Sequence, residues 1–80
     1  MDEFGFTEYF LHEVLRKRPY LRKKYCTGVV KNPLRVQQQE GNRWRFWGRV
    51  KELDNRIVRV VTLSDKRTIH NAFLDRGYRP

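Results

Sequence analysis

Residues 43 to 49 read Arg-Trp-Arg-Phe-Trp-Gly-Arg, and this alternation decides how the chain is expected to fold. Successive side chains of a β-strand point to opposite faces of its sheet. The stretch therefore predicts a charged face of Arg43, Arg45, Trp47 and Arg49 and an apolar face of Trp44, Phe46 and Val50. The apolar face suits a hydrophobic core. The charged face suits either a solvated surface or the recognition of phosphates and stacked bases.

Upstream of this strand the periodicity is helical. Apolar residues recur at helical spacing over residues 6–17, where Thr7 is placed to cap the start of a helix. Pro19 ends this helix and is placed as the first residue of a second helix over residues 19–31, which Asn32-Pro33 terminates.

Beyond Pro33 the apolar residues alternate, which predicts strands over residues 34–39, 43–53, 56–63 and 67–73. Short turns between consecutive strands make the sheet antiparallel. A chain of 80 residues also has no room for a second core. The sequence therefore predicts a single α+β domain over residues 1–80, with two N-terminal helices packed on one face of a four-stranded antiparallel β-meander.

The charge balance of the chain is strongly basic. Lysine and arginine total 18 residues against 9 acidic ones, and the formal net charge is +9. An excess of this size points to an anionic partner, which is a nucleic acid, an acidic protein or a membrane surface. Arginine outnumbers lysine, which favours planar, bidentate contacts over diffuse attraction.

Several function classes find no support in the sequence. Cys26 is the only cysteine, so a disulfide within the chain or a cysteine-based zinc site is not expected. His12 and His70 lie on different elements without a carboxylate at metal-ligand spacing, so we expect no metal and no cofactor. No segment approaches the roughly 20 apolar residues that span a bilayer. We therefore expect a cytoplasmic protein without a membrane partner.

The pleat extends the charged face to neighbouring strands. It adds Arg59 and His70 to Arg45, Trp47 and Arg49, because a buried Arg59 without a partner would be costly. Cleavage of RNA through its 2′-hydroxyl needs an acid, a base and stabilisation of the phosphorane charge. Histidine titrates near neutral pH, and preorganised arginines stabilise developing charge.

The predicted catalytic residues are accordingly His70, Arg59 and Arg45, and the predicted nucleic-acid contacts are Arg43, Arg49, Trp47 and Arg76, with Asn71 and Asp75 as supporting residues. An exposed Trp47 would stack an unpaired base. Each residue also has a plainer interpretation. A strand histidine is more often structural, a strand-face arginine is usually solvated, and Trp47 equally suits a cover over the sheet or a protein interface.

Part of the chain resembles a family of small bacterial proteins of unassigned function. These proteins share an Asn-Pro helix stop, an Arg-x-x-x-Trp-Gly strand and a Thr-x-His-Asn-Ala-Phe ending, which match Asn32-Pro33, Arg43 to Gly48 and Thr68 to Phe73. The resemblance covers about residues 20 to 80. The order of elements is also similar to that of the RelE/ParE/BrnT-like toxin superfamily.

This second resemblance implies a ribonuclease of a toxin–antitoxin pair, with an arginine-rich sheet that holds RNA and an acidic antitoxin as partner. Arg45, Arg59 and His70 fit the roles of its basic and histidine residues by position. The leading hypothesis is therefore a toxin-like RNA-binding protein that acts as a metal-independent endoribonuclease. The alternatives are a non-catalytic module that binds nucleic acid or an acidic protein, and an interaction protein whose charge provides solubility.

Overall fold

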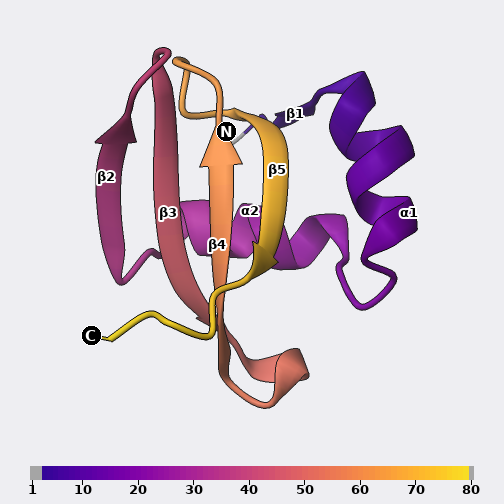
Figure 1. Ribbon diagram of the computed structural model, residues 1–80, viewed down its shortest axis with the longest axis vertical. Coiled ribbons are helices and arrows are strands. Elements are labelled where there is room, and N and C mark those ends of the chain that lie inside the picture. Colours follow the sequence, from indigo (N-terminus) through magenta and orange to yellow (C-terminus); the bar gives the residue numbers. More distant parts are fainter. Residues whose placement is uncertain (1–2, 80) are drawn as a thin grey trace.

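The computed structural model describes residues 3–79, which form a sheet of short strands with helical segments behind and beside it (Figure 1). In chain order the elements are β1 (Gly5–Phe6), the π-helical η1 (Phe10–Val14), α1 (Leu15–Lys17), α2 (Lys23–Lys31), β2 (Arg35–Gln39), β3 (Arg43–Val50), the 3-10 helix η2 (Lys51–Leu53), β4 (Arg56–Thr62) and β5 (Thr68–Leu74). The spatial order of the strands is β1-β5-β4-β3-β2.

The expected four-stranded antiparallel meander is wrong, because the sheet is mixed and has a fifth strand. Strands β2 to β5 pair antiparallel in chain order, but β1 runs parallel to β5 at its free edge. The backbone N–H of Gly5 donates to the Arg67 carbonyl at 3.1 Å, and that of Thr7 donates to the Ile69 carbonyl at 3.0 Å. Phe6 fits the helical spacing of the residues that follow it, so periodicity alone assigned this edge strand to a helix.

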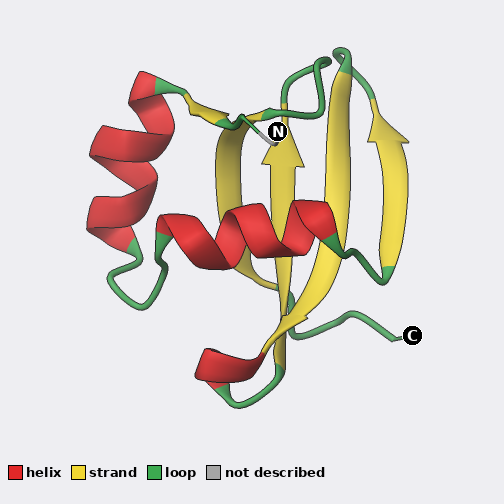
Figure 2. Ribbon diagram, turned by 180° about the vertical axis from the view of Figure 1, so that it is seen from behind, coloured by secondary structure: helices red, strands yellow, loops and turns green. Residues whose placement is uncertain are grey.

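The two helices do not pack as a pair on one face of the sheet, which corrects the second part of the expected fold. Helix α2 crosses the face formed by β3 and β4, whereas η1 and α1 stand beside β5 (Figure 2). Phe10 and Val14 of η1 are nevertheless fully buried, and they share one core with Cys26 and Val29 of α2. Burial raises the pKa of the Cys26 thiol to about 12, so this side chain is an inert part of that core.

The first helical segment begins after Thr7, whose hydroxyl accepts a hydrogen bond from the backbone N–H of Phe10 at 3.1 Å. It ends at Arg18, which has non-helical angles (φ −124°, ψ 76°), as expected before a proline. The second helix starts at Lys23 rather than at Pro19. Residues 18–22 form a turn that buries Leu21 in the core, and Arg22 is extended, so helix cannot form across this segment.

Strand β3 is shorter than expected and ends at Val50 instead of near Leu53. The turn that follows contains η2 and two residues in the left-handed region, Asp54 (φ 58°) and Asn55 (φ 59°). Aspartate and asparagine tolerate this conformation better than other non-glycine residues. The chain reverses there without continuing the ladder, so the apparent alternation past Val50 reflects turn geometry rather than a strand.

Gly48 lets helix α2 approach strand β3 closely. A Cβ at this position would lie 3.1 Å from both methyl carbons of Val29. Gly48 is buried between Phe46 and Val50 in sequence, and both of these side chains belong to the core. The small residue in the middle of the strand is therefore a packing requirement of the helix–sheet contact.

We expect Gly48→Ala to lower the free energy of unfolding by about 1–3 kcal/mol, because the added methyl group overpacks the contact with Val29. Gly28→Ala is the matched control. A Cβ on this exposed helical glycine meets no atom within 4 Å, and alanine favours helix by up to about 1 kcal/mol. Urea unfolding of both variants measures the difference. A Gly48→Ala protein as stable as the original would contradict the close packing.

Candidate nucleic-acid interface

The sheet face opposite α2 carries a row of alternating cationic and aromatic side chains. The row crosses four strands in register, from Arg35 on β2 through Trp47 on β3 and Arg59 on β4 to Phe73 on β5. The guanidinium carbons of Arg35 and Arg59 lie 5.3 and 5.6 Å from the Trp47 ring centroid. Arg59 is also 4.7 Å from the Phe73 ring centroid. Each aromatic ring is therefore flanked by a cation in contact range.

The C-terminal segment after β5 folds back across this open face (Figure 1). The Asp75 carboxylate accepts a hydrogen bond from Trp47 Nε1 at 2.9 Å and pairs with Arg59 Nη2 at 3.0 Å. Three residues further on, the ring of Tyr78 stacks on Trp47 with centroids 5.8 Å apart and an interplanar angle of 23°. The segment thus holds the indole by its N–H and by its ring.

Trp47 is only 5% exposed as a result. The expectation of an exposed tryptophan ready to stack a base is therefore wrong for the free protein. The alternation of the strand predicts the correct face for Trp47. It cannot predict that the C-terminal segment covers the ring, because the contact with Asp75 joins residues 28 positions apart in the sequence.

Asp75 is the centre of this cluster. The hydrogen bond from Trp47 and the charge and hydrogen bond of Arg59 hold the pKa of the Asp75 carboxyl below its usual range, against the opposing effect of burial. Its second oxygen, Oδ1, accepts a bond from the backbone N–H of Gly77 at 3.1 Å. Both carboxylate oxygens are therefore engaged within the protein.

A cavity of about 590 Å³ opens beside the returning tail. Three arginines from separate segments line it: Arg49 of β3, Arg56 of β4 and Arg76 of the tail. Among the described residues that line it, Asp75 is the only acidic one, and that carboxylate is already bonded to other groups. The cavity therefore gathers three positive charges that its own walls do not neutralise.

His70 lies away from this cavity, at a register shift between β4 and β5. Its Nδ1 is hydrogen-bonded to the Thr7 hydroxyl at 3.0 Å, and its ring packs against that of Tyr9 with centroids 5.0 Å apart. Burial, and then the positive charge of Arg43, lower the pKa of His70 below its usual value. The neutral imidazole is thereby favoured.

The predicted catalytic residues are not gathered at one point. Arg59 is opposite Phe73 in the register, three residues along β5 from His70, which corresponds to about 10 Å of strand. Arg45 lies in the neighbouring row, opposite Val61, and its buried Nε has no hydrogen-bond partner among residues 3–79. Arg59 itself is committed to Asp75.

The predicted residues form three groups on the sheet. Trp47 and Arg59 form the first group and are joined through Asp75. The second group, Arg49 and Arg76, lines the cavity. The third group, Arg43, Arg45 and His70, occupies the end of the sheet where β3 begins.

Sequence reasoning missed Arg56, Arg35 and Tyr78. The predicted strands contain Arg35 and Arg56, so their positions could be read from the sequence, whereas the tail that carries Tyr78 has no periodicity to read.

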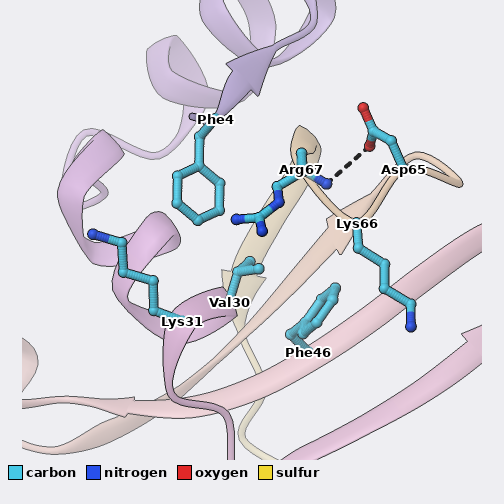
Figure 3. Close-up of a pocket in the computed structure, with 7 residues that line it drawn as sticks. All are labelled: Phe4, Val30, Lys31, Phe46, Asp65, Lys66 and Arg67. Atoms are coloured by element: carbon cyan, nitrogen blue, oxygen red, sulfur yellow. Dashed lines mark hydrogen bonds between the residues drawn. The ribbon is translucent and has the colours of Figure 1, made fainter. Parts of the chain in front are cut away.

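A second cavity, of about 380 Å³, lies on the helix side of the sheet (Figure 3). Its basic side chains rest on aromatic rings: Arg67 is 5.5 Å from the Phe4 centroid, and the Lys66 ammonium is 3.9 Å from that of Trp44. Figure 3 shows the Asp65 carboxylate turned away from the cavity, where it accepts a bond from the backbone N–H of Arg67 at 2.9 Å. These contacts make the second cavity the weaker candidate for an anionic ligand.

Comparison with protein-family models, with curated proteins and with solved structures finds no match for this chain. The resemblance to RelE/ParE/BrnT-like toxins therefore stays a prediction. No helix within residues 3–79 is long and apolar enough to cross a membrane. The same residues contain no group of three or more histidine, cysteine or acidic side chains placed to hold a metal ion. The arginine-lined cavity remains the chemically most specific feature.

Proposed function

We propose that the protein binds RNA through its phosphate groups, at the cavity lined by Arg49, Arg56 and Arg76. The observation that carries this proposal is that three arginines line a cavity whose one acidic residue, within residues 3–79, is already bonded to other groups. Guanidinium groups match phosphate geometry bidentately.

The charge of the whole chain supports a polyanionic ligand. A formal net charge of +9 on 80 residues attracts a phosphate backbone over distances longer than a single contact. Arg35 extends the positive surface beside the cavity along the exposed edge strand β2. A strand of RNA would therefore meet arginines in succession rather than at one point.

Binding is supported better than cleavage. An acid–base histidine must reach the reacting oxygen of a phosphate that the stabilising cations contact at the same time. Here His70 lies three residues along β5 from the position opposite Arg59, and Arg59 is already paired with Asp75. We therefore propose a non-catalytic binding module. Cleavage of RNA by the purified protein would overturn this choice.

The test compares RNA binding by the Arg49→Gln/Arg56→Gln/Arg76→Gln protein and by a control with equal loss of charge. The control, Lys17→Gln/Arg22→Gln/Lys51→Gln, changes exposed side chains for which no ion pair is observed among the described residues. Fluorescence anisotropy with labelled single-stranded RNA measures both affinities over a series of salt concentrations. We expect the cavity variant to lose RNA affinity at least about tenfold. The slope of log affinity against log salt concentration should also become shallower by about one for each lost phosphate contact.

Equal losses in the two variants would show that only net charge matters and would contradict a site at the cavity. Gel analysis of the RNA after incubation provides the second readout. We expect it to stay intact, with and without ribosomes. Cleavage by the purified protein that disappears in a His70→Ala variant would favour the ribonuclease instead.

A further inference from the structure

We infer that Trp47 is a stacking subsite for an unpaired RNA base, and that Tyr78 occupies this subsite in the free protein. The inference rests on the proposed RNA binding and adds to it a base-recognition step and an internal competitor.

The segment imitates the chemistry of a nucleotide. An anionic group, the Asp75 carboxylate, pairs with Arg59 at 3.0 Å, and an aromatic ring, that of Tyr78, stacks on Trp47. A nucleotide offers the same combination of a negative phosphate and a flat base at a short separation. Tryptophan stacks bases of any identity, since every base has a π-face.

The stacking subsite is continuous with the phosphate cavity. Tyr78 contacts Trp47 with its ring and also lines the cavity that holds Arg49, Arg56 and Arg76. Movement of this one side chain would uncover the indole and enlarge the cavity at the same time. An RNA strand whose phosphates lie in the cavity therefore has a base within reach of Trp47.

The contacts of Tyr78 are weak enough for a base to replace them. The stack with Trp47 and a backbone N–H bond to the Asp75 carbonyl at 3.4 Å are its observed contacts among the described residues, apart from the cavity wall. The Asp75 side chain, in contrast, is held by three residues, Trp47, Arg59 and Gly77. The ring can therefore leave while Asp75 keeps the indole N–H and Arg59 in place.

The test measures binding of an oligoadenylate of about ten nucleotides and of an abasic oligonucleotide of equal length. We expect Tyr78→Ala to bind the oligoadenylate about five- to tenfold more tightly than the original protein, because the competitor is gone, and the ratio of oligoadenylate affinity to abasic-strand affinity to rise by the same factor. Tyr78→Phe retains the ring and is the matched control, with an affinity close to that of the original protein. Circular dichroism establishes that each variant is folded at the temperature used.

A second measurement uses the original tail, so that the inference does not depend on how Tyr78→Ala folds. In a Trp44→Phe background the emission of Trp47 is observed alone. We expect saturating oligoadenylate to quench it and the abasic strand to leave it unchanged. Unchanged emission, or an oligoadenylate affinity that Tyr78→Ala does not raise, would overturn the inference.

The two proposals fail in different ways. If RNA binds with the expected dependence on the cavity arginines but is indifferent to Tyr78 and to the presence of bases, only the stacking subsite is refuted. If neither the original protein nor Tyr78→Ala binds either strand, the proposed RNA binding is refuted, and the stacking subsite is refuted with it.

Discussion

Replacing Trp47 with alanine is expected to lower the free energy of unfolding by about 3–5 kcal/mol. The indole is 5% exposed and lies between Arg35 and Arg59, beneath Tyr78. Its removal opens a cavity and leaves the Asp75 carboxylate without one of its donors. A domain of this length has about 4–12 kcal/mol of total stability, so the variant would be unfolded in a measurable fraction of molecules.

Urea unfolding followed by far-UV circular dichroism measures this loss. Trp47→Phe is the control, because phenylalanine keeps an aromatic ring under Tyr78 but cannot donate to Asp75. It should cost about 1–2 kcal/mol, clearly less than alanine. A loss below about 1 kcal/mol for Trp47→Ala would mean that the tail does not hold the indole against the sheet in solution.

The strand that contains Trp47 is also the part of the fold that sequence reasoning describes best. Phe46 and Val50 are buried in the core and Arg49 is exposed on the opposite face, as the alternation predicts. The prediction succeeds because a pleated strand with one buried face cannot slip by a single residue without exposing its whole apolar set. Strand β3 has eight residues with strong alternation, so the local sequence alone is enough to predict which of its side chains are buried.

Other parts of the fold depend on contacts that no local pattern encodes. Strand β1 contains only two residues, which is too short for any period. It exists because the carbonyl of Ile69 in β5 and that of Arg67, just before β5, accept its backbone hydrogen bonds. Helix α2 begins late because burial of Leu21 takes precedence over the helix-starting preference of Pro19. Long-range pairing and core burial therefore account for the differences from the expected fold.

In the candidate site, too, local alternation predicts some features, and contacts between distant residues determine the others. Pleat reasoning and the observed register both place Arg59 on the face that carries Trp47. The partner that neutralises Arg59, however, is Asp75, which reaches it from beyond the end of the last strand. A sequence reading can list the charges on a face, but the charges left for a ligand emerge only after the ion pairs within the protein are known.

Removing the Asp75 carboxylate is expected to lower the free energy of unfolding by about 1–3 kcal/mol at pH 7 in the variant Asp75→Ala. The change leaves both Trp47 Nε1 and the Arg59 guanidinium without their observed acceptor. Asp75→Asn is the conservative variant. Its amide oxygen still accepts the indole N–H, so it should lose mainly the charge interaction with Arg59 and cost less than alanine.

The effect of pH distinguishes a loss of charge from a loss of packing. The hydrogen bond from Trp47 and the charge of Arg59 lower the pKa of Asp75 in the folded protein below the ordinary value of 3.8. The carboxylate therefore contributes stability that is complete above that ordinary value and is lost as the pH falls through the lower, folded-state pKa. The pKa of Asp65 is also lowered, because hydrogen bonds from Thr68 and from nearby backbone N–H groups outweigh the effect of burial. Asp65 is present in the original protein and in both Asp75 variants, so its contribution cancels when they are compared.

Denaturant unfolding at pH 7 and near pH 2 measures this linkage. The original protein and Asp75→Asn should differ at pH 7 and converge in acid, because a protonated carboxyl and an amide present similar groups to Trp47 and Arg59. Asp75→Ala should stay less stable than Asp75→Asn at both pH values, since it lacks the acceptor in either condition. A difference between the original protein and Asp75→Asn that is equal at the two pH values would mean that Asp75 fixes the tail by shape alone, with no contribution from its ion pair.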